Sequence, residues 1–168
     1  MLPKIKRDKT PEEATATLMR LCARAEKSSG DARRLMRGWG VADTAAEAVL
    51  QTLLSQKFID DSRYAAAFVR EKVNLSGWGI YKIRTTLLHK GIAPTLVEEA
   101  LAELDHNKMA ERLSKQLERK SKTIKPTTAY ELKTKLIRYG LSLGYPYEGV
   151  MDAVNELVKN APECNDFF

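Results

Sequence analysis

The sequence lacks the features that mark several large classes of protein. Its 168 residues include only two cysteines, Cys22 and Cys164, which are too few and too far apart for a disulfide framework or a zinc site. It has no uncharged apolar run of the roughly 18 residues that a transmembrane helix needs. The first ten residues are basic, but no apolar segment follows them, so we expect no signal peptide. Together these absences predict a cytoplasmic protein.

Residues that could perform catalysis are also scarce. The two histidines, His89 and His106, belong to no HExxH motif, and the loops that contain glycine and serine match neither of the common nucleotide-binding patterns. The adjacent carboxylates of Asp60 and Asp61 could hold a metal ion. Directly before an apolar helical run, however, such a pair more often caps the helix. We therefore predict that the protein is not an enzyme and has no cofactor and no metal site.

Strand signals are nearly absent, whereas helix signals recur along the whole chain. Thr10, Pro11 and Glu13 match a capping box with proline in the first turn, and similar boxes begin at Thr44 and Thr128. The segment Ser28-Ser29-Gly30 is expected to close the first helix. The spacing of apolar residues predicts nine helices, over 11–27, 31–38, 44–56, 61–74, 79–89, 94–104, 106–122, 127–143 and 147–160.

Three glycines reveal an internal repeat. Gly40, Gly91 and Gly144 are 51 and 53 residues apart, and each lies between two helices with apolar stripes. Glycine at these turns allows the chain to reverse with a positive φ. We predict an all-α protein of three tandem three-helix repeats, over 1–57, 58–105 and 106–168, the last with a C-terminal tail. Stacked repeats of this kind form an elongated and curved molecule.

Positive charge is concentrated in one region. The chain has 28 Lys and Arg against 22 Asp and Glu, a formal net charge of +6. Residues 108–138 alone contain ten basic and three acidic residues, a local charge of +7. The basic residues of this region are Lys108, Arg112, Lys115, Arg119, Lys120, Lys122, Lys125, Lys133, Lys135 and Arg138.

This basic region has two interpretations. It could be an ordinary solvated helix face, or a surface for an anion such as a nucleic-acid backbone or an acidic protein groove. Arg112, Lys115 and Arg119 fall on one side of the predicted helix, which favours the second interpretation. Lys82 and Arg84 form a smaller basic group in the middle repeat.

The middle repeat resembles the RecX family. The resemblance rests on residues 58–65, FIDDSRYA, followed by Gly79, Ile83, Leu87 and residues 90–92, KGI. The motif residues are Asp60, Asp61, Arg63, Tyr64, Lys90 and Gly91, which we expect to act as helix caps and turns.

The resemblance implies a function that composition alone does not indicate. RecX proteins are bacterial regulators built from tandem three-helix repeats, with roles in DNA repair, recombination and the SOS response. They bind the filament of RecA on single-stranded DNA and restrain its ATPase, strand-exchange and coprotease activities. By this resemblance we expect RecA to be the partner, with single-stranded DNA as a further ligand of the basic face, and we expect a monomer that binds no membrane.

Two other functions fit the same helical pattern. A tandem helix-turn-helix protein also consists of three-helix units, but the third helices here carry few of the Arg, Asn or Gln residues that read a DNA groove. The stretch 96–101, LVEEAL, is acidic instead. A scaffold that binds only another protein would use the basic face merely for solubility, and reversing the charge of Lys115, Arg119 and Lys122 would then leave its function intact.

Overall fold

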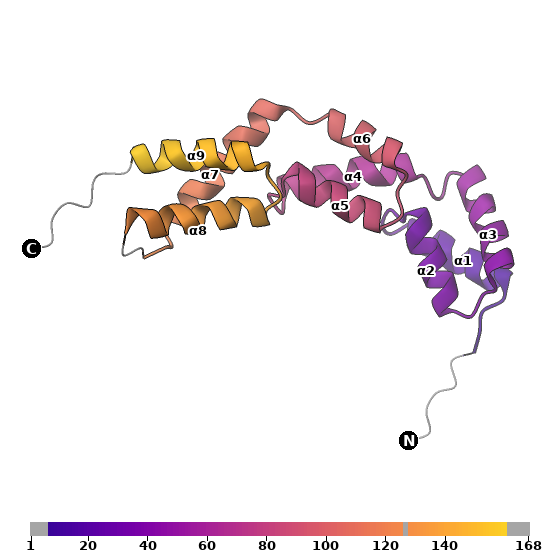
Figure 1. Ribbon diagram of the computed structural model, residues 1–168. Coiled ribbons are helices and arrows are strands. Elements are labelled where there is room, and N and C mark those ends of the chain that lie inside the picture. The colour runs from indigo at the N-terminus through magenta and orange to yellow at the C-terminus, as the bar shows by residue number, and fades with distance from the viewer. Residues whose placement is uncertain (1–6, 126–127, 161–168) are drawn as a thin grey trace, which may run out of the picture. The chain divides into compact units, whose positions relative to one another are not determined.

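The computed structural model describes residues 7–125 and 128–160, and this part of the chain contains nine α-helices and no strand (Figure 1). The all-α prediction is therefore confirmed, while Cys164 and the C-terminal tail lie outside the described residues. The helices are α1 (Pro11–Cys22), α2 (Ser29–Gly38), α3 (Asp43–Ser55), α4 (Asp61–Asn74), α5 (Ile80–His89), α6 (Pro94–Ala102), α7 (His106–Ser121), α8 (Ala129–Ser142) and α9 (Tyr147–Lys159).

The helix ends agree with the predicted ends to within two residues, except at the C-terminus of α1. Ser28 does not close α1. It is the N-cap of α2: its hydroxyl accepts a hydrogen bond from the Asp31 amide at 3.0 Å, and the Asp31 carboxylate accepts one from the Ser28 amide at 3.3 Å. The prediction for Ser28-Ser29-Gly30 was therefore wrong, because this serine satisfies the start of the next helix.

Two of the three predicted caps are present. Thr10 forms a complete capping box with Glu13, and the Thr128 hydroxyl accepts a hydrogen bond from the Glu131 amide at 3.1 Å. The third prediction was wrong, since α3 begins at Asp43 after Ala42 and has no side-chain cap. Thr44 lies within the first turn of α3 and is exposed.

The contacts of the chain divide it into two compact units. Unit 1 comprises Met1–Val69 and Thr86–Ala100, and unit 2 comprises Arg70–Thr85 and Leu101–Phe168. The helices of the middle repeat, α4 to α6, are thus divided between the two units. The repeat boundaries at 57/58 and 105/106 stay a prediction.

The core of unit 1 is built mainly from α1, α2 and α3. Its fully buried side chains include Leu18 of α1, Met36 of α2 and Leu50 and Leu53 of α3. Trp39, at the end of α2, is partly buried against this core. Cys22 also packs there, and burial raises the pKa of its thiol.

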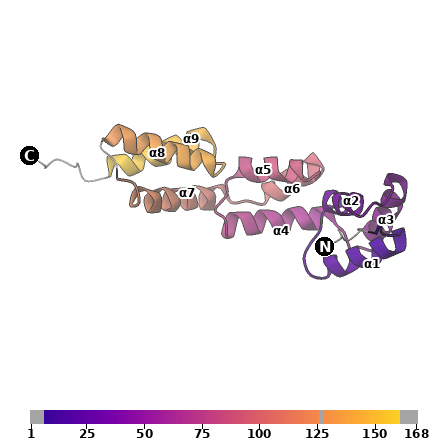
Figure 2. The ribbon, with the colours of Figure 1, turned by 90° about the horizontal axis from the view of Figure 1, so that it is seen from below.

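The core of unit 2 lies between α7, α8 and α9, which run beside one another (Figure 2). Leu113 and Leu117 of α7, Leu136 of α8 and Val154 of α9 are almost completely buried. Gly140 lets α8 approach α9 closely, because a β-carbon at this position would lie 2.7 Å from a methyl group of Val150. Among the described residues, no helix combines the length and apolar character required to cross a membrane.

The three turn glycines have the backbone conformation that the repeat predicted. Gly40, Gly91 and Gly144 have φ values of 74°, 79° and 89°, a region that side chains rarely adopt. The helices on either side of Gly40, α2 and α3, contact each other, as do α8 and α9 on either side of Gly144. The prediction of a positive φ at these positions is confirmed.

Each unit contains a close backbone contact between the start of one helix and one of these glycine turns. In unit 1, Gly30 at the start of α2 lies against the carbonyl of Lys90. In unit 2, the Gly79 amide donates to the Leu143 carbonyl at 2.7 Å, and the Tyr81 amide donates to the Gly144 carbonyl at 2.9 Å.

Candidate functional site

The side of α7 away from the core carries a stripe of positive charge. Lys108, Arg112, Lys115 and Arg119 follow one another at intervals of four, three and four residues, so they fall on one side of the helix. Lys108, Lys115 and Arg119 are exposed, and none of them forms an ion pair with another described residue. We call these four residues the α7 stripe.

Arg112 is the innermost member of the α7 stripe. It is only partly exposed, and its Nη1 is buried without a hydrogen-bond partner in the described chain. Its charge acts to lower the pKa of Tyr145, although burial is the larger effect and raises that pKa. On the neighbouring turn of α7, Gln116 donates to the Gly77 carbonyl at 3.1 Å. Arg112 therefore lies at the inner edge of the stripe.

Several other predicted basic residues have partners that reduce their availability. Lys122 pairs with Glu118 at 3.4 Å, and Lys135 pairs with Glu131 at 2.6 Å, each across one helical turn. The Lys120 ammonium lies 5.2 Å from the centre of the Tyr139 ring. Two of the three acidic residues already subtracted in the local charge of +7 thus pair with Lys122 and Lys135 and not with the α7 stripe.

The remaining basic residues of this region do not extend the stripe as one face. Lys125 is exposed beyond the end of α7, and Arg138 is exposed on α8. Lys133 is partly buried and, by helical periodicity, lies on a different side of α8 from Lys135 and Arg138.

Lys82 and Arg84 are packed against aromatic rings. The Lys82 ammonium lies 4.5 Å from the centre of the Trp78 ring and donates to the Ser142 carbonyl at 3.4 Å. Because Ser142 is the last residue of α8, this cation also faces the negative end of a helix dipole. The Arg84 guanidinium lies 5.7 Å from the centre of the Tyr81 ring.

The motif residues of the middle repeat lie in unit 1, where they contact the segment 26–31. The Asp60 carboxylate caps α4 by accepting from the Arg63 amide at 3.0 Å. The Asp61 carboxylate accepts from the Ser29 amide at 2.7 Å, and Arg63 donates to Glu26 at 2.6 Å. These residues therefore join the middle repeat to the first one.

Lys90, Gly91 and Tyr64 complete this junction. The Lys90 ammonium lies 3.8 Å from the Asp31 carboxylate and 5.9 Å from the centre of the Tyr64 ring. Burial acts to raise the pKa of Asp31, but the hydrogen bonds from Ser28 and the charge of Lys90 outweigh it, so the pKa is lowered. These contacts place the motif residues at the junction, and their structural role stays a prediction.

Sequence reasoning missed the partners of the motif. It assigned the motif residues to caps and turns but did not identify Glu26 or Asp31 as the groups that they contact. The Ser28-x-x-Asp31 spacing is a recognised N-cap pattern and could have located this part of the junction. No group of three or more His, Cys, Asp or Glu side chains in the described ranges could hold a metal ion.

Comparison with known proteins finds a family model that matches the region of the motif. Residues 60–101 match the family model described as RecX, second three-helix domain. The chain is 32% identical over 121 residues to regulatory protein RecX of Clostridium tetani, covering 71% of this chain and 55% of the relative. It is 26% identical over 151 residues to the Clostridium beijerinckii protein of the same name, covering 89% of this chain and 69% of the relative. By these matches the chain is similar to the RecX family.

Solved RecX structures share the fold of this chain. A crystal structure of RecX from Lactobacillus salivarius superimposes with a TM-score of 0.77 and 18% identity, covering 88% of this chain and 96% of that one. A second crystal structure, of regulatory protein RecX, superimposes with a TM-score of 0.78 and 21% identity. The match covers 89% of this chain and 73% of that one. The chain spans only about half the length of the curated relatives it matches, 55% for the C. tetani protein.

Proposed function

We propose that this chain regulates the RecA recombinase by binding the RecA filament on single-stranded DNA and inhibiting its ATPase, strand-exchange and coprotease activities. Two observations support the proposal. The curated relatives are named regulatory protein RecX, and the α7 stripe presents positive charge that an anionic partner can use. The α7 stripe is the observation on which the choice of contact residues depends.

The stripe has the properties of an electrostatic contact. From Lys108 to Arg119 the helix rises by about 16 Å, so the exposed cations can meet several anionic groups along one partner. Lysine and arginine on an open helix face bind phosphates without reading bases. The same charges would also suit an acidic protein surface, so the filament could supply either partner.

A tandem helix-turn-helix function is less well supported. In such a protein the third helix of a unit enters a DNA groove. The corresponding helices here expose carboxylates, with Glu98 and Glu99 on α6 and Asp152 on α9. Negative side chains on these faces would repel phosphates, so we favour the filament regulator.

The test is the ATPase activity of RecA from the same organism on poly(dT). We expect the wild-type chain to lower ATP hydrolysis at near-stoichiometric ratios. Reversing three stripe charges, Lys108→Glu, Lys115→Glu and Arg119→Glu, should weaken this inhibition at least tenfold. The matched control reverses three exposed cations of unit 1, Arg20→Glu, Arg24→Glu and Arg37→Glu, and both variants change the formal net charge from +6 to zero.

Only the stripe variant should lose inhibition, with both variants keeping a helical circular dichroism spectrum. If the chain binds DNA directly, the slope of log affinity against log salt on poly(dT) should fall by about two in the stripe variant. No change in ATP hydrolysis at any ratio would refute the proposed function. Equal losses in both variants would refute the role of the stripe.

A further inference from the structure

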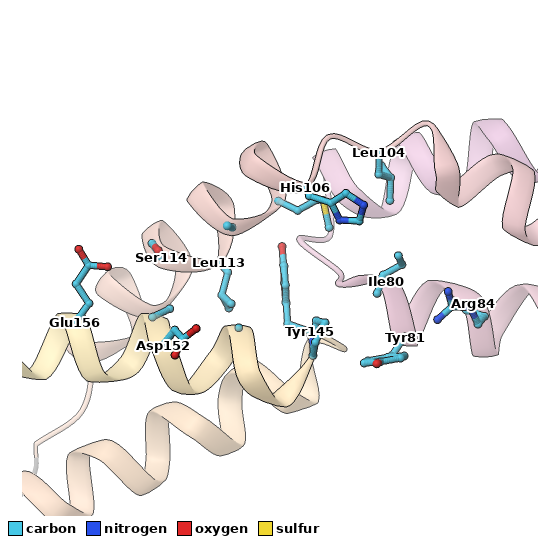
Figure 3. Close-up of a pocket in the computed structure, with 15 residues that line it drawn as sticks. Ile80, Tyr81, Arg84, Leu104, His106, Leu113, Ser114, Tyr145, Asp152 and Glu156 are labelled. Carbon is cyan, nitrogen blue, oxygen red and sulfur yellow. The ribbon is translucent and has the colours of Figure 1, made fainter.

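A cavity of about 540 Å³ lies in unit 2, between the start of α5, α7 and α9 (Figure 3). Its wall is mainly apolar, with Ile80, Leu104, Met109 and Leu113 among the lining residues, and Tyr145 standing at its centre. Its size falls in the range of roughly 300–1,000 Å³ that is usual for ligand pockets.

Small residues on two facing helices create this cavity. Ala110 and Ser114 lie one turn apart on α7, and Gly149 and Ala153 lie one turn apart on α9. A β-carbon added at Gly149 would meet no atom within 4 Å. The two helices therefore leave an open space where longer side chains would otherwise meet.

The two ends of the cavity carry different charges. Asp152 and Glu156 lie one turn apart on α9 at one end, and both are exposed. Neither forms an ion pair within the part of the chain that the structure describes. Arg84 and His106 lie at the other end (Figure 3).

We propose that this cavity is a docking site for an amphipathic helical segment of a partner protein. Apolar side chains of the segment would fill the cavity, and a lysine or arginine at one of its ends would meet Asp152 and Glu156. Grooves between helices commonly receive such segments through residues at i, i+3, i+4 and i+7. A nucleic acid is a poor occupant, because its phosphates would face the two carboxylates.

This inference does not depend on the proposed function. By helical periodicity, Ala110 and Ser114 lie on a different side of α7 from Lys108, Lys115 and Arg119. The cavity and the α7 stripe are therefore separate surfaces of unit 2. A protein segment in the cavity and an anion on the stripe could be bound at the same time.

The test uses two fluorescein-labelled helical peptides of 14 residues with leucines at i, i+3, i+4 and i+7. They differ only in two residues at one end, which are lysines in one peptide and glutamates in the other. In fluorescence polarisation we expect saturable binding of the lysine peptide and at least tenfold weaker binding of the glutamate peptide. The double variant Asp152→Lys with Glu156→Lys should reverse this preference.

A cavity-filling variant, Gly149→Leu, should weaken the binding of the lysine peptide at least tenfold. Leucine has a higher helix propensity than glycine and meets no atom at the β-carbon, so α9 should stay folded. The control is Gly38→Leu at the end of α2 in unit 1, where a β-carbon also meets nothing within 4 Å. This control should bind the peptide as the wild type does.

Four results would overturn the inference. The first is no saturable binding of either peptide. The second is unchanged binding by the Gly149→Leu variant. The third is a dimer in sedimentation velocity that Gly149→Leu abolishes, which would assign the cavity to a second copy. The fourth is competition of poly(dT) with the lysine peptide, which would assign the cavity to nucleic acid. Loss of RecA inhibition by the stripe variant would leave the peptide result unaffected, so the two proposals fail independently.

Discussion

Replacing Gly30 with alanine should weaken the junction between the first and middle repeats. Gly30 is the second residue of α2, and its α-carbon lies against the glycine turn that follows α5. A β-carbon here would overlap the carbonyl oxygen of Lys90 and lie 3.1 Å from its carbonyl carbon. Because both atoms belong to the backbone, no side-chain rotation can relieve the overlap, and the turn must move away from α2.

The size of the effect follows from two destabilising terms and one stabilising term. Overpacking a well-packed contact costs about 1–3 kcal/mol. Moving the turn would also lengthen the ion pair between Lys90 and Asp31, which is already 3.8 Å long. Alanine in a helix interior gains up to about 1 kcal/mol over glycine. We expect a net destabilisation of about 1–2 kcal/mol.

The matched variant is Gly38→Ala at the other end of α2, where a β-carbon meets no atom within 4 Å. It should be neutral or stabilising by up to about 1 kcal/mol, so the two variants should differ by about 1–3 kcal/mol. For a chain of this size that difference corresponds to about 2–12 °C in Tm.

Thermal and urea unfolding followed by circular dichroism measure this difference. Hydrogen exchange of the Ser29 amide, which donates to Asp61 at 2.7 Å, reports on the junction itself. This amide should exchange faster in Gly30→Ala and be unchanged in Gly38→Ala. Equal stability of the two variants, or a more stable Gly30→Ala, would refute the argument from the backbone contact.

Local signals predicted the helices because they act within a few residues. The capping box at Thr10 and the turn glycines are satisfied by their own neighbours, so the sequence around them was sufficient. Ser28 was assigned to the wrong helix because a serine beside a glycine fits both a helix end and a helix start. Its partner three residues later, Asp31, decides between them.

The candidate site was harder to predict because its properties depend on distant partners. The sequence correctly located an excess of positive charge in residues 108–138, but counting charges could not show that Lys120 packs on Tyr139. The cavity left no single motif, since it arises from small residues on α7 and α9 that come together only when the helices pack.

Two further predictions concern the core and the junction of unit 1. Leu53→Ala removes a fully buried side chain and should cost about 2–5 kcal/mol in urea unfolding, whereas a cost below about 1 kcal/mol would contradict its place in the core. The Asp31→Asn substitution should make the free energy of unfolding depend less on pH in the acidic range. The pKa of Asp31 is lowered in the folded chain, so its ionised form contributes stability that is complete above its ordinary pKa of about 3.9 and is lost as the pH falls through the lower folded value. The stability difference between the wild type and Asp31→Asn should therefore be constant above about pH 5 and shrink below about pH 4. Urea titrations at a series of pH values measure it, and a difference that stays the same in acid would show that the carboxylate is not held ionised by Ser28 and Lys90.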